Sequence, residues 1–146
     1  MKVKEIMTKE VKMIGPNLPI KEAARLMRDN DIGIVLVEED DRLVGVLTDR
    51  DITIRSLASG RDPLAIAIKE IMTPKVLYCF EEDSIEDVAK NMGKNHVRRL
   101  PVLNKDKRLV GIISLGDVAS KGSKPAAAEA LFLISKEGHP PIFKIA

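Results

Sequence analysis

The chain has 146 residues and a mass of 16.1 kDa, a length that fits one ordinary domain or two small halves that share a core. Hydrophobic residues make up 45% and charged residues 32%, which excludes a disordered or fibrous protein. The 24 basic and 22 acidic side chains leave a net charge of +2, too small to predict a nucleic-acid or membrane partner from charge.

The single cysteine, Cys79, cannot form an intramolecular disulfide, and neither His96 nor His139 has a cysteine or second histidine nearby in sequence. We therefore expect no metal site. The first ten residues lack the apolar stretch of a signal peptide, and no apolar run is long enough to span a membrane, so we expect a cytoplasmic protein. Glutamine and tryptophan are absent and charged residues are frequent, a bias typical of thermophile proteins.

An internal repeat is the most informative feature of the sequence. The segment 3–8 reads VKEIMT, and the segment 68–73 reads IKEIMT. Farther along, the motif RLVG at 42–45 recurs at 108–111, with one residue inserted before the second occurrence. The repeat spans roughly residues 3 to 60 and 68 to 121.

Each copy begins with the same two predicted elements. Residues 11–14 and 76–80 are short apolar stretches that end at turn-forming or acidic residues, and they predict brief strands. An apolar stripe at positions i, i+3, i+4 and i+7 follows in each copy and predicts a helix. The stripe consists of Ile20, Ala23, Ala24 and Met27 in the first copy and of Ile85, Val88, Ala89 and Met92 in the second.

A hairpin and a second helix complete each copy. Two apolar runs around a polar turn predict hairpins at 34–47 and 102–113, and second helices begin near Asp49 and Leu115. The sequence therefore predicts an α/β fold in which the order β-α-β-β-α occurs twice. Because one such unit buries little surface, we expect the copies to pack about a pseudo-two-fold axis with two equivalent clefts between them.

Residues 123–146 lie outside the repeat. Ser123 is a candidate cap, Pro125 stands in the first turn, and strong helix formers follow as far as Ile134, so a helix is expected. Gly138 then predicts a stop, followed by an extended break and a short apolar end at 142–145. An exposed apolar tail is a liability, so we expect it to pack on its own module or on a partner's.

The motif G-x-x-[ST]-x-x-D follows each hairpin, at 45–51 and 111–117. One interpretation is a capping box, in which the hydroxyl caps the helix and the aspartate returns a bond to the cap's backbone amide. The other is functional, because a helix amino terminus offers N–H groups to a phosphate and a carboxylate accepts hydrogen bonds from a ribose diol. The sequence leaves both interpretations open.

With these motifs the chain resembles a pair of CBS domains, the Bateman module named after cystathionine β-synthase. The resemblance covers about residues 1–122 and rests on IMT at the head of each copy, LPV in the second hairpin, RLVG in both, and the closing motif. It implies tandem CBS domains at 1–62 and 66–122, followed by a C-terminal helix and tail at 123–146. It also implies a non-catalytic regulatory module that binds an adenosyl ligand between the domains.

The resemblance assigns ligand roles to the closing motifs. The final aspartate holds the ribose hydroxyls and the preceding hydroxyl lies near ribose or phosphate, which implies Asp117 with Ser114 in a favoured site. Arg98 and Arg99 are expected to bind phosphate there, although neighbouring strand residues point to opposite sides, which leaves open that one is solvated. The adenine side of the favoured site would come from Thr8, Val11, Lys12 and Ile32.

The second site would use Asp51 and Thr48 in the same roles. No charge replaces the arginine pair in the first copy, so this site is either empty or dependent on Arg50. Its adenine side would come from Thr73, Val76, Leu77 and Val97. For Val11, Ile32, Val76 and Val97, an ordinary place in the core is the alternative.

We expect AMP, ADP or ATP as a regulatory ligand, because two arginines favour a phosphorylated ligand. The alternatives are a module that binds S-adenosylmethionine or RNA, or a purely structural dimerisation scaffold. The sequence has no G-x-S-x-G, H-E-x-x-H or P-loop motif that would favour an enzyme. Nor does it repeat an aromatic platform that would favour nucleic acid.

The remaining partners are expected to be proteins. We expect a homodimer, because CBS pairs commonly associate and each copy carries more apolar helix than its sheet can cover. The apolar residues that the sheet cannot cover are Ile52, Ile54 and Leu57 in the second helix of the first copy. The tail adds the apolar run from Leu131 to Ile134. The sequence does not identify the regulated protein.

Overall fold

The computed structural model describes residues 1–136, so the predicted stop at Gly138, the extended break and the apolar end lie outside the described residues. The chain divides into two compact units. Of the described residues, Val11–Val76 form the first-copy unit, and Met1–Glu10 together with residues 77–136 form the second-copy unit. Each unit therefore contains the leading segment, 3–8 or 68–73, of the other sequence copy.

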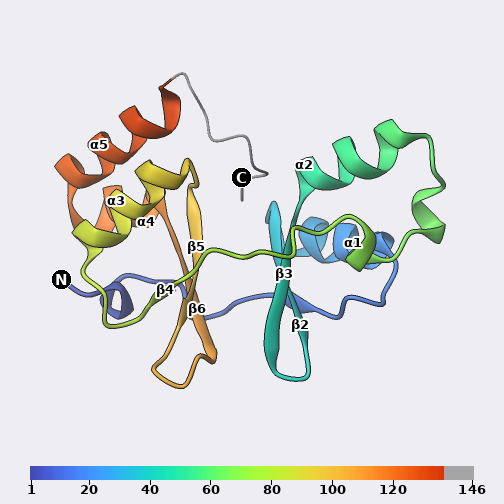
Figure 1. The fold of residues 1–146 in the computed structure, drawn as a ribbon, viewed down its shortest axis with the longest axis horizontal. Coiled ribbons are helices and arrows are strands. Elements are labelled where there is room, and N and C mark those ends of the chain that lie inside the picture. Colours follow the sequence, from blue (N-terminus) through green and yellow to red (C-terminus); the bar gives the residue numbers. More distant parts are fainter. Residues whose placement is uncertain (137–146) are drawn as a thin grey trace. The chain divides into compact units, whose positions relative to one another are not determined.

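The first-copy unit contains a three-stranded sheet in the order β1-β2-β3 (Figure 1). Strand β1 (Met13–Ile14) pairs in parallel with β2 (Ile34–Glu39), and β2 pairs antiparallel with β3 (Arg42–Thr48). Helix α1 (Ile20–Asn30) connects β1 and β2. After β3 come α2 (Asp49–Asp51), wide helical turns over Ile52–Ser56 and 3-10 turns at Leu57–Ser59, Pro63–Ala65 and Ile68–Glu70.

The second-copy unit repeats this arrangement in the order β4-β5-β6. A 3-10 turn at Val3–Glu5 precedes β4 (Cys79–Phe80), α3 (Ile85–Asn95), β5 (Arg99–Leu103) and β6 (Leu109–Ser114). Helix α4 (Leu115–Asp117), wide turns over Val118–Gly122 and α5 (Lys124–Ser135) follow. The predicted order β-α-β-β-α is confirmed in both copies. Among residues 1–136, no helix has the length and apolar character needed to cross a membrane.

The apolar stripes of α1 and α3 face the cores of their units, with one exception. All four stripe residues of α3 are buried, but on α1 Ala24 is exposed, so the prediction of its place in the stripe's buried face was wrong. Helix α5 packs along α3 in the second-copy unit, whereas the described first-copy unit has no equivalent of α5. Basic side chains beside Ala24 stay in water instead: Lys21, Arg25 and Arg28.

Gly93 allows α5 to approach α3 closely. A Cβ atom at this position would lie 2.8 Å from Leu133 Cδ1 and 3.3 Å from Ala130 Cα. The equivalent position in the first copy is Arg28, whose side chain would block such packing. The tail helix therefore packs on its own module, and it begins at the predicted cap, where Ser123 Oγ accepts a bond from Ala126 N at 3.2 Å.

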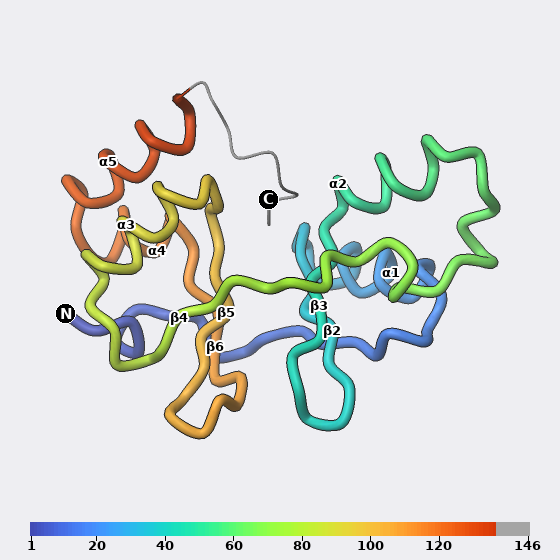
Figure 2. Tube along the Cα trace, viewed as in Figure 1, coloured from blue at the N-terminus to red at the C-terminus, as the bar shows by residue number. Residues whose placement is uncertain are grey.

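The two repeated motifs IMT and RLVG contact each other across the copies. Thr8 of the first leading segment pairs with Ile112 on β6, and Thr73 of the second pairs with Val46 on β3. Figure 2 shows the first leading segment, in blue, beside β6. A Cβ atom at Gly111, the glycine of the second RLVG, would lie 2.8 Å from Thr8 O, so glycine is required for this approach.

Candidate functional site

Both closing motifs form capping boxes. In the first copy Asp51 N donates to Thr48 Oγ1 at 3.1 Å, and Thr48 N donates to Asp51 Oδ2 at 2.9 Å. In the second copy the corresponding bonds between Ser114 and Asp117 measure 3.0 and 2.9 Å. The capping interpretation is therefore confirmed. Because each box uses Oδ2 of its aspartate, Oδ1 is the atom through which a ligand could also bind.

The Oδ1 atoms of the two aspartates have different partners. Asp51 Oδ1 lies 3.5 Å from a guanidinium nitrogen of Arg55, whose side chain is only 20% exposed. Asp117 Oδ1 lies 3.3 Å from Lys121 Nζ, on a side chain that is 54% exposed. Asp117 therefore has a partner that a ligand can displace into water, whereas the partner of Asp51 is largely buried.

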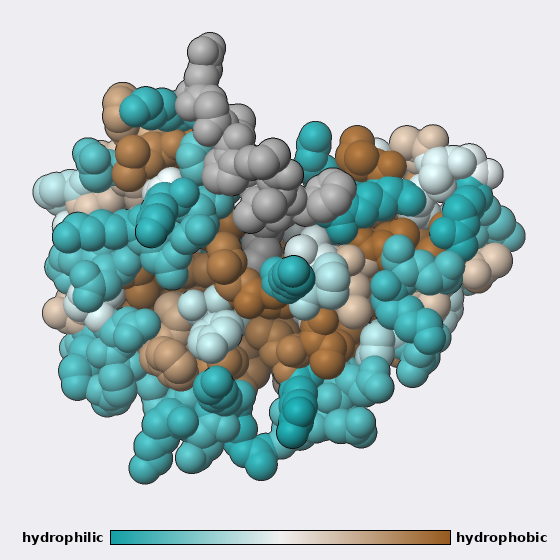
Figure 3. All heavy atoms as spheres, in the orientation of Figure 1, coloured by the Kyte–Doolittle hydropathy of each residue, from teal (hydrophilic) through white to brown (hydrophobic). Residues whose placement is uncertain are grey.

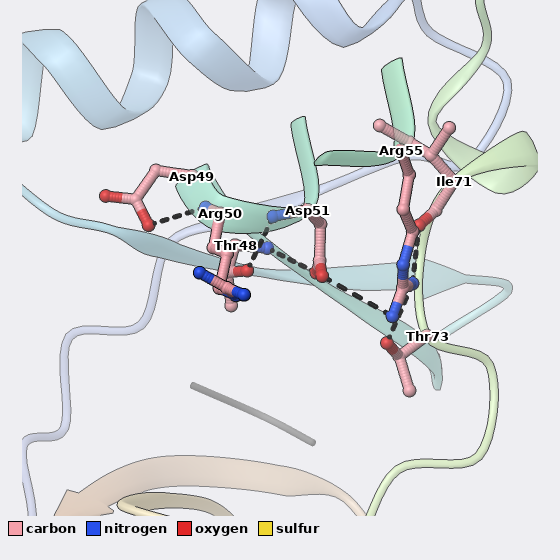
Figure 4. A network of polar contacts seen from close by, with 7 residues as sticks. All are labelled: Thr48, Asp49, Arg50, Asp51, Arg55, Ile71 and Thr73. Carbon is pink, nitrogen blue, oxygen red and sulfur yellow. Dashed lines mark hydrogen bonds and ion pairs between the residues drawn. The ribbon is translucent and has the colours of Figure 1, made fainter. Parts of the chain in front are cut away.

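Arg55 also fixes the second leading segment (Figure 4). Its NH1 atom donates to Ile71 O at 2.8 Å and to Thr73 Oγ1 at 3.1 Å. Two residues predicted for the second ligand site, Asp51 and Thr73, are thus held together by one partly buried cation. In Figure 4 the side chain of Arg55 lies between them, and Asp49 points the other way.

A pocket of about 560 Å³ lies within the second-copy unit. Three of the residues predicted for the favoured site line it: Arg98, Arg99 and Ser114. Asp117 adjoins it through the capping bonds to Ser114. The other lining residues come from the turns after β6 and from α5, and they are Leu115, Gly116, Ala119, Lys124, Ala127, Ala128 and Leu131. None of these ten described residues carries a carboxylate, so the pocket suits an anion.

The corresponding place in the first-copy unit lacks the net positive charge of the second-copy pocket. Gly33 stands where the second copy has Arg98, and the backbone is alike, because Asp49 N donates to Gly33 O as Leu115 N donates to Arg98 O. A Cβ atom at Gly33 would lie 3.0 Å from Asp49 Oδ2. The pocket here measures about 360 Å³ and is lined by Asp49, Arg50, Thr53 and Ile54. Arg50, the cation predicted for this site, does line the pocket, but Asp49 beside it leaves the lining without the excess of cations that would favour a phosphate.

The residues predicted for the adenine sides divide between the two units. Thr8, Leu77 and Val97 belong to the second-copy unit, as Ser114 and the two arginines do. The first-copy unit contains the others, which are Val11, Lys12, Ile32, Thr73 and Val76. Val97 is 1% exposed and belongs to the core of its unit, whereas Val11, Ile32 and Val76 are half-buried.

Sequence reasoning missed three cations near these motifs. Arg55 follows Asp51 by four residues, as Lys121 follows Asp117, and this helical spacing could have revealed both pairs. Lys124 lines the second-copy pocket but lies in the tail, outside the repeat, and no repeated motif draws attention to it.

Cys79 is not a nucleophile. Its side chain is buried, and burial, together with the nearby charge of Asp83, raises the pKa of the thiol to about 12. Its Sγ donates to Pro101 O at 3.8 Å. The thiol is therefore protonated at neutral pH.

A family model and a curated protein match most of the chain. The model of the CBS domain matches twice, at residues 3–57 and 68–124. The CBS domain-containing protein YhcV of Bacillus subtilis is 39% identical over 136 residues, which cover 92% of this chain and 96% of that protein.

Three solved structures are also similar. A CBS domain protein of Thermoplasma acidophilum has a TM-score of 0.82 at 24% identity and covers 95% of this chain and 79% of its own, which shows a shared fold. The CBS domain pair of protein MJ0100, in complex with 5′-methylthioadenosine and S-adenosyl-L-methionine, has a TM-score of 0.72 at 30% identity, over 82% of this chain and 93% of its own. A hexameric CBS-CP12 protein from bloom-forming cyanobacteria has a TM-score of 0.73 at 31% identity. The similarity covers 84% of this chain and 72% of that one.

Proposed function

Because the chain belongs to the CBS domain family and contains two copies of the domain, we propose that it is a non-catalytic regulatory module for an adenine nucleotide. Nucleotide binding at the second-copy site changes the shape of the module, and a partner protein responds to that change. The observation that carries this proposal is the carboxylate-free pocket where Arg98, Arg99 and Ser114 come together beside Asp117. The adenosyl ligands of the MJ0100 domain pair support it.

Each polar residue of the second-copy site has a role in this proposal. Asp117 Oδ1 accepts hydrogen bonds from the ribose hydroxyls and releases Lys121, while Oδ2 keeps its capping bond. Arg98 and Arg99 bind phosphate oxygens, and the Ser114 hydroxyl lies near them. Of the residues predicted for the adenine side, Thr8 lies in the same unit as this pocket. Two guanidinium groups, in a lining whose described residues include no carboxylate, favour a phosphorylated ligand such as AMP, ADP or ATP over S-adenosylmethionine.

The first-copy site is a weaker site in this proposal. Arg55 already occupies Oδ1 of Asp51, and Asp49 lies where the second copy presents Arg98. A nucleotide there would have to displace a largely buried guanidinium and bring phosphate close to a carboxylate. We therefore expect one nucleotide per chain at moderate concentrations.

A thermal-shift panel of AMP, ADP, ATP, S-adenosylmethionine and a short single-stranded RNA tests the proposed function. A ligand at about 100 times its Kd stabilises the native state by about 2.7 kcal/mol, so the best nucleotide raises Tm by several degrees. The nucleotide shift persists at moderate salt, whereas an RNA shift would disappear there. Absence of stabilisation by every nucleotide at millimolar concentration would overturn the proposal.

We also propose that two copies form a homodimer. Apolar side chains are exposed on the segment after β3 and on α5, with Ile54 51%, Leu57 66%, Leu131 46% and Phe132 61% exposed. Figure 3 shows apolar surface over both segments. Light scattering at micromolar concentration should give a mass of about 32 kDa, twice that of the chain. Phe132→Glu should weaken the dimer, and the control Leu18→Glu should not. A mass near 16.1 kDa for the unchanged protein would reject the proposed dimer.

A further inference from the structure

We propose that α5 forms one wall of the nucleotide site and that Lys124 binds the outer phosphates of ADP or ATP. The module then distinguishes nucleoside di- and triphosphates from the monophosphate. This inference rests on the proposed function and goes beyond it, because Lys124 and α5 lie outside the two CBS copies that define the family resemblance.

The pocket has two walls of different chemistry. Arg98, Arg99 and Ser114 stand at the ends of β5 and β6, where the predicted phosphate and ribose ligands meet. The other wall is one side of α5, and its residues recur at i, i+3, i+4 and i+7, as a single helix face does: Lys124, Ala127, Ala128 and Leu131. Between Lys124 and Leu131 this wall is formed by the small side chains of Ala127 and Ala128.

The position of α5 is fixed by contacts that do not involve the pocket. Ser123 caps its first turn, and Leu133 and Ala130 lie against the bare backbone of Gly93 on α3. Lys124 is the first residue of this helix, so its backbone is held in place before any ligand binds. The cost of ordering it on binding is therefore mainly that of its own side chain.

The phosphate side of the pocket has one more cation than a monophosphate needs, because Asp117, the adjoining carboxylate, is assigned to the ribose. Arg98, Arg99 and Lys124 provide three cations, and no lining residue within the described chain provides an anion. A terminal phosphate carries up to about two negative charges, which the two arginines can match. We assign the third cation, Lys124 on the α5 wall, to the additional phosphates of ADP and ATP.

The first-copy unit has neither of these features. Its equivalent pocket contains Asp49, and no described helix takes the place of α5 beside it. The tail helix therefore adds to the differences between the two sites, and it is the element to which we assign the preference for a polyphosphate.

Calorimetric titration of AMP, ADP and ATP, without divalent cations, tests this inference on the full chain and on Lys124→Gln. The unchanged protein should bind ATP most tightly and AMP least. Loss of one charge-assisted contact should weaken ATP binding about tenfold and AMP binding less than about twofold. Lys124→Arg should restore ATP affinity. Lys105→Gln, on the exposed hairpin turn of the same unit, is the matched control and should change neither Kd.

The outcomes separate this inference from the proposed function. If the unchanged protein binds nucleotides but Lys124→Gln weakens AMP and ATP equally, or weakens neither, Lys124 is an ordinary solvated side chain and only this inference fails. If the unchanged protein binds no nucleotide, both fail. Equal affinity of the unchanged protein for AMP and ATP would also overturn the discrimination proposed for α5.

Discussion

Asp117→Ala should weaken nucleotide binding by about one to two orders of magnitude, and Asp51→Ala should weaken it far less. Loss of an ionised acceptor for the ribose costs about 1.5 to 3 kcal/mol, which corresponds to this range in Kd. Asp117 adjoins the pocket that contains two arginines, whereas Asp51 is already paired with Arg55 and lies in a unit with Asp49 at the phosphate position. Calorimetric Kd values for ATP measure both effects.

Asp117→Asn is the control for the structural role of this aspartate. An amide oxygen can still accept the capping bond from Ser114 N, so helix stability should be largely kept while the charged ribose acceptor is lost. The affinity of Asp117→Asn for ATP should therefore resemble that of Asp117→Ala. Its Tm should lie closer to that of the unchanged protein. If Asp51→Ala were the more damaging substitution, the nucleotide would bind in the first-copy site.

Arg55→Met should lower the free energy of unfolding by about 3 kcal/mol, the range measured when one partner of a buried ion pair is removed. The substitution leaves Asp51, which is 7% exposed, without its cation, and it removes donors from Ile71 O and Thr73 Oγ1. Lys121→Met, at the equivalent position of the second copy, should cost at most about 1 kcal/mol, because Lys121 is mostly exposed. Urea denaturation of both variants gives the comparison.

Equal losses for the two variants would contradict the structural role of Arg55. Arg55→Lys refines the test, because a lysine keeps the charge but cannot bind the aspartate and the leading segment with a planar guanidinium. Arg55→Lys should therefore recover only part of the free energy of unfolding that Arg55→Met loses. Full recovery would mean that charge alone, without the bonds to Ile71 and Thr73, accounts for the stability.

The order of elements was predictable because hydrophobic period and turn chemistry act locally. The helical stripe of α3 and the hairpins followed from spacing alone, and the repeat placed the closing motifs. Ala24 was misjudged because its burial depends on whether a further helix covers the same face. Gly93 allows α5 to pack on α3 in the second copy, whereas the side chain of Arg28, at the equivalent position of the first copy, would block such a helix.

The exchange of leading segments could not be predicted from the repeat. Both copies contain IMT and RLVG, so the sequence is the same whether each IMT contacts the glycine of its own copy or of the other. The contacts of Thr8 with Ile112 and of Thr73 with Val46 decide between these arrangements. The pocket wall from α5 was likewise not predictable, because it depends on how the tail packs on α3.

Titration calorimetry of the full chain with ATP tests the central claim most directly, because it reports affinity and stoichiometry together. We predict one ATP per chain in the concentration range of the tight site, and no binding of comparable affinity at a second site. Absence of binding would contradict the proposed function. Two equivalent ATP molecules per chain would contradict the distinction drawn between Asp117 beside its pocket and Asp51 held by Arg55.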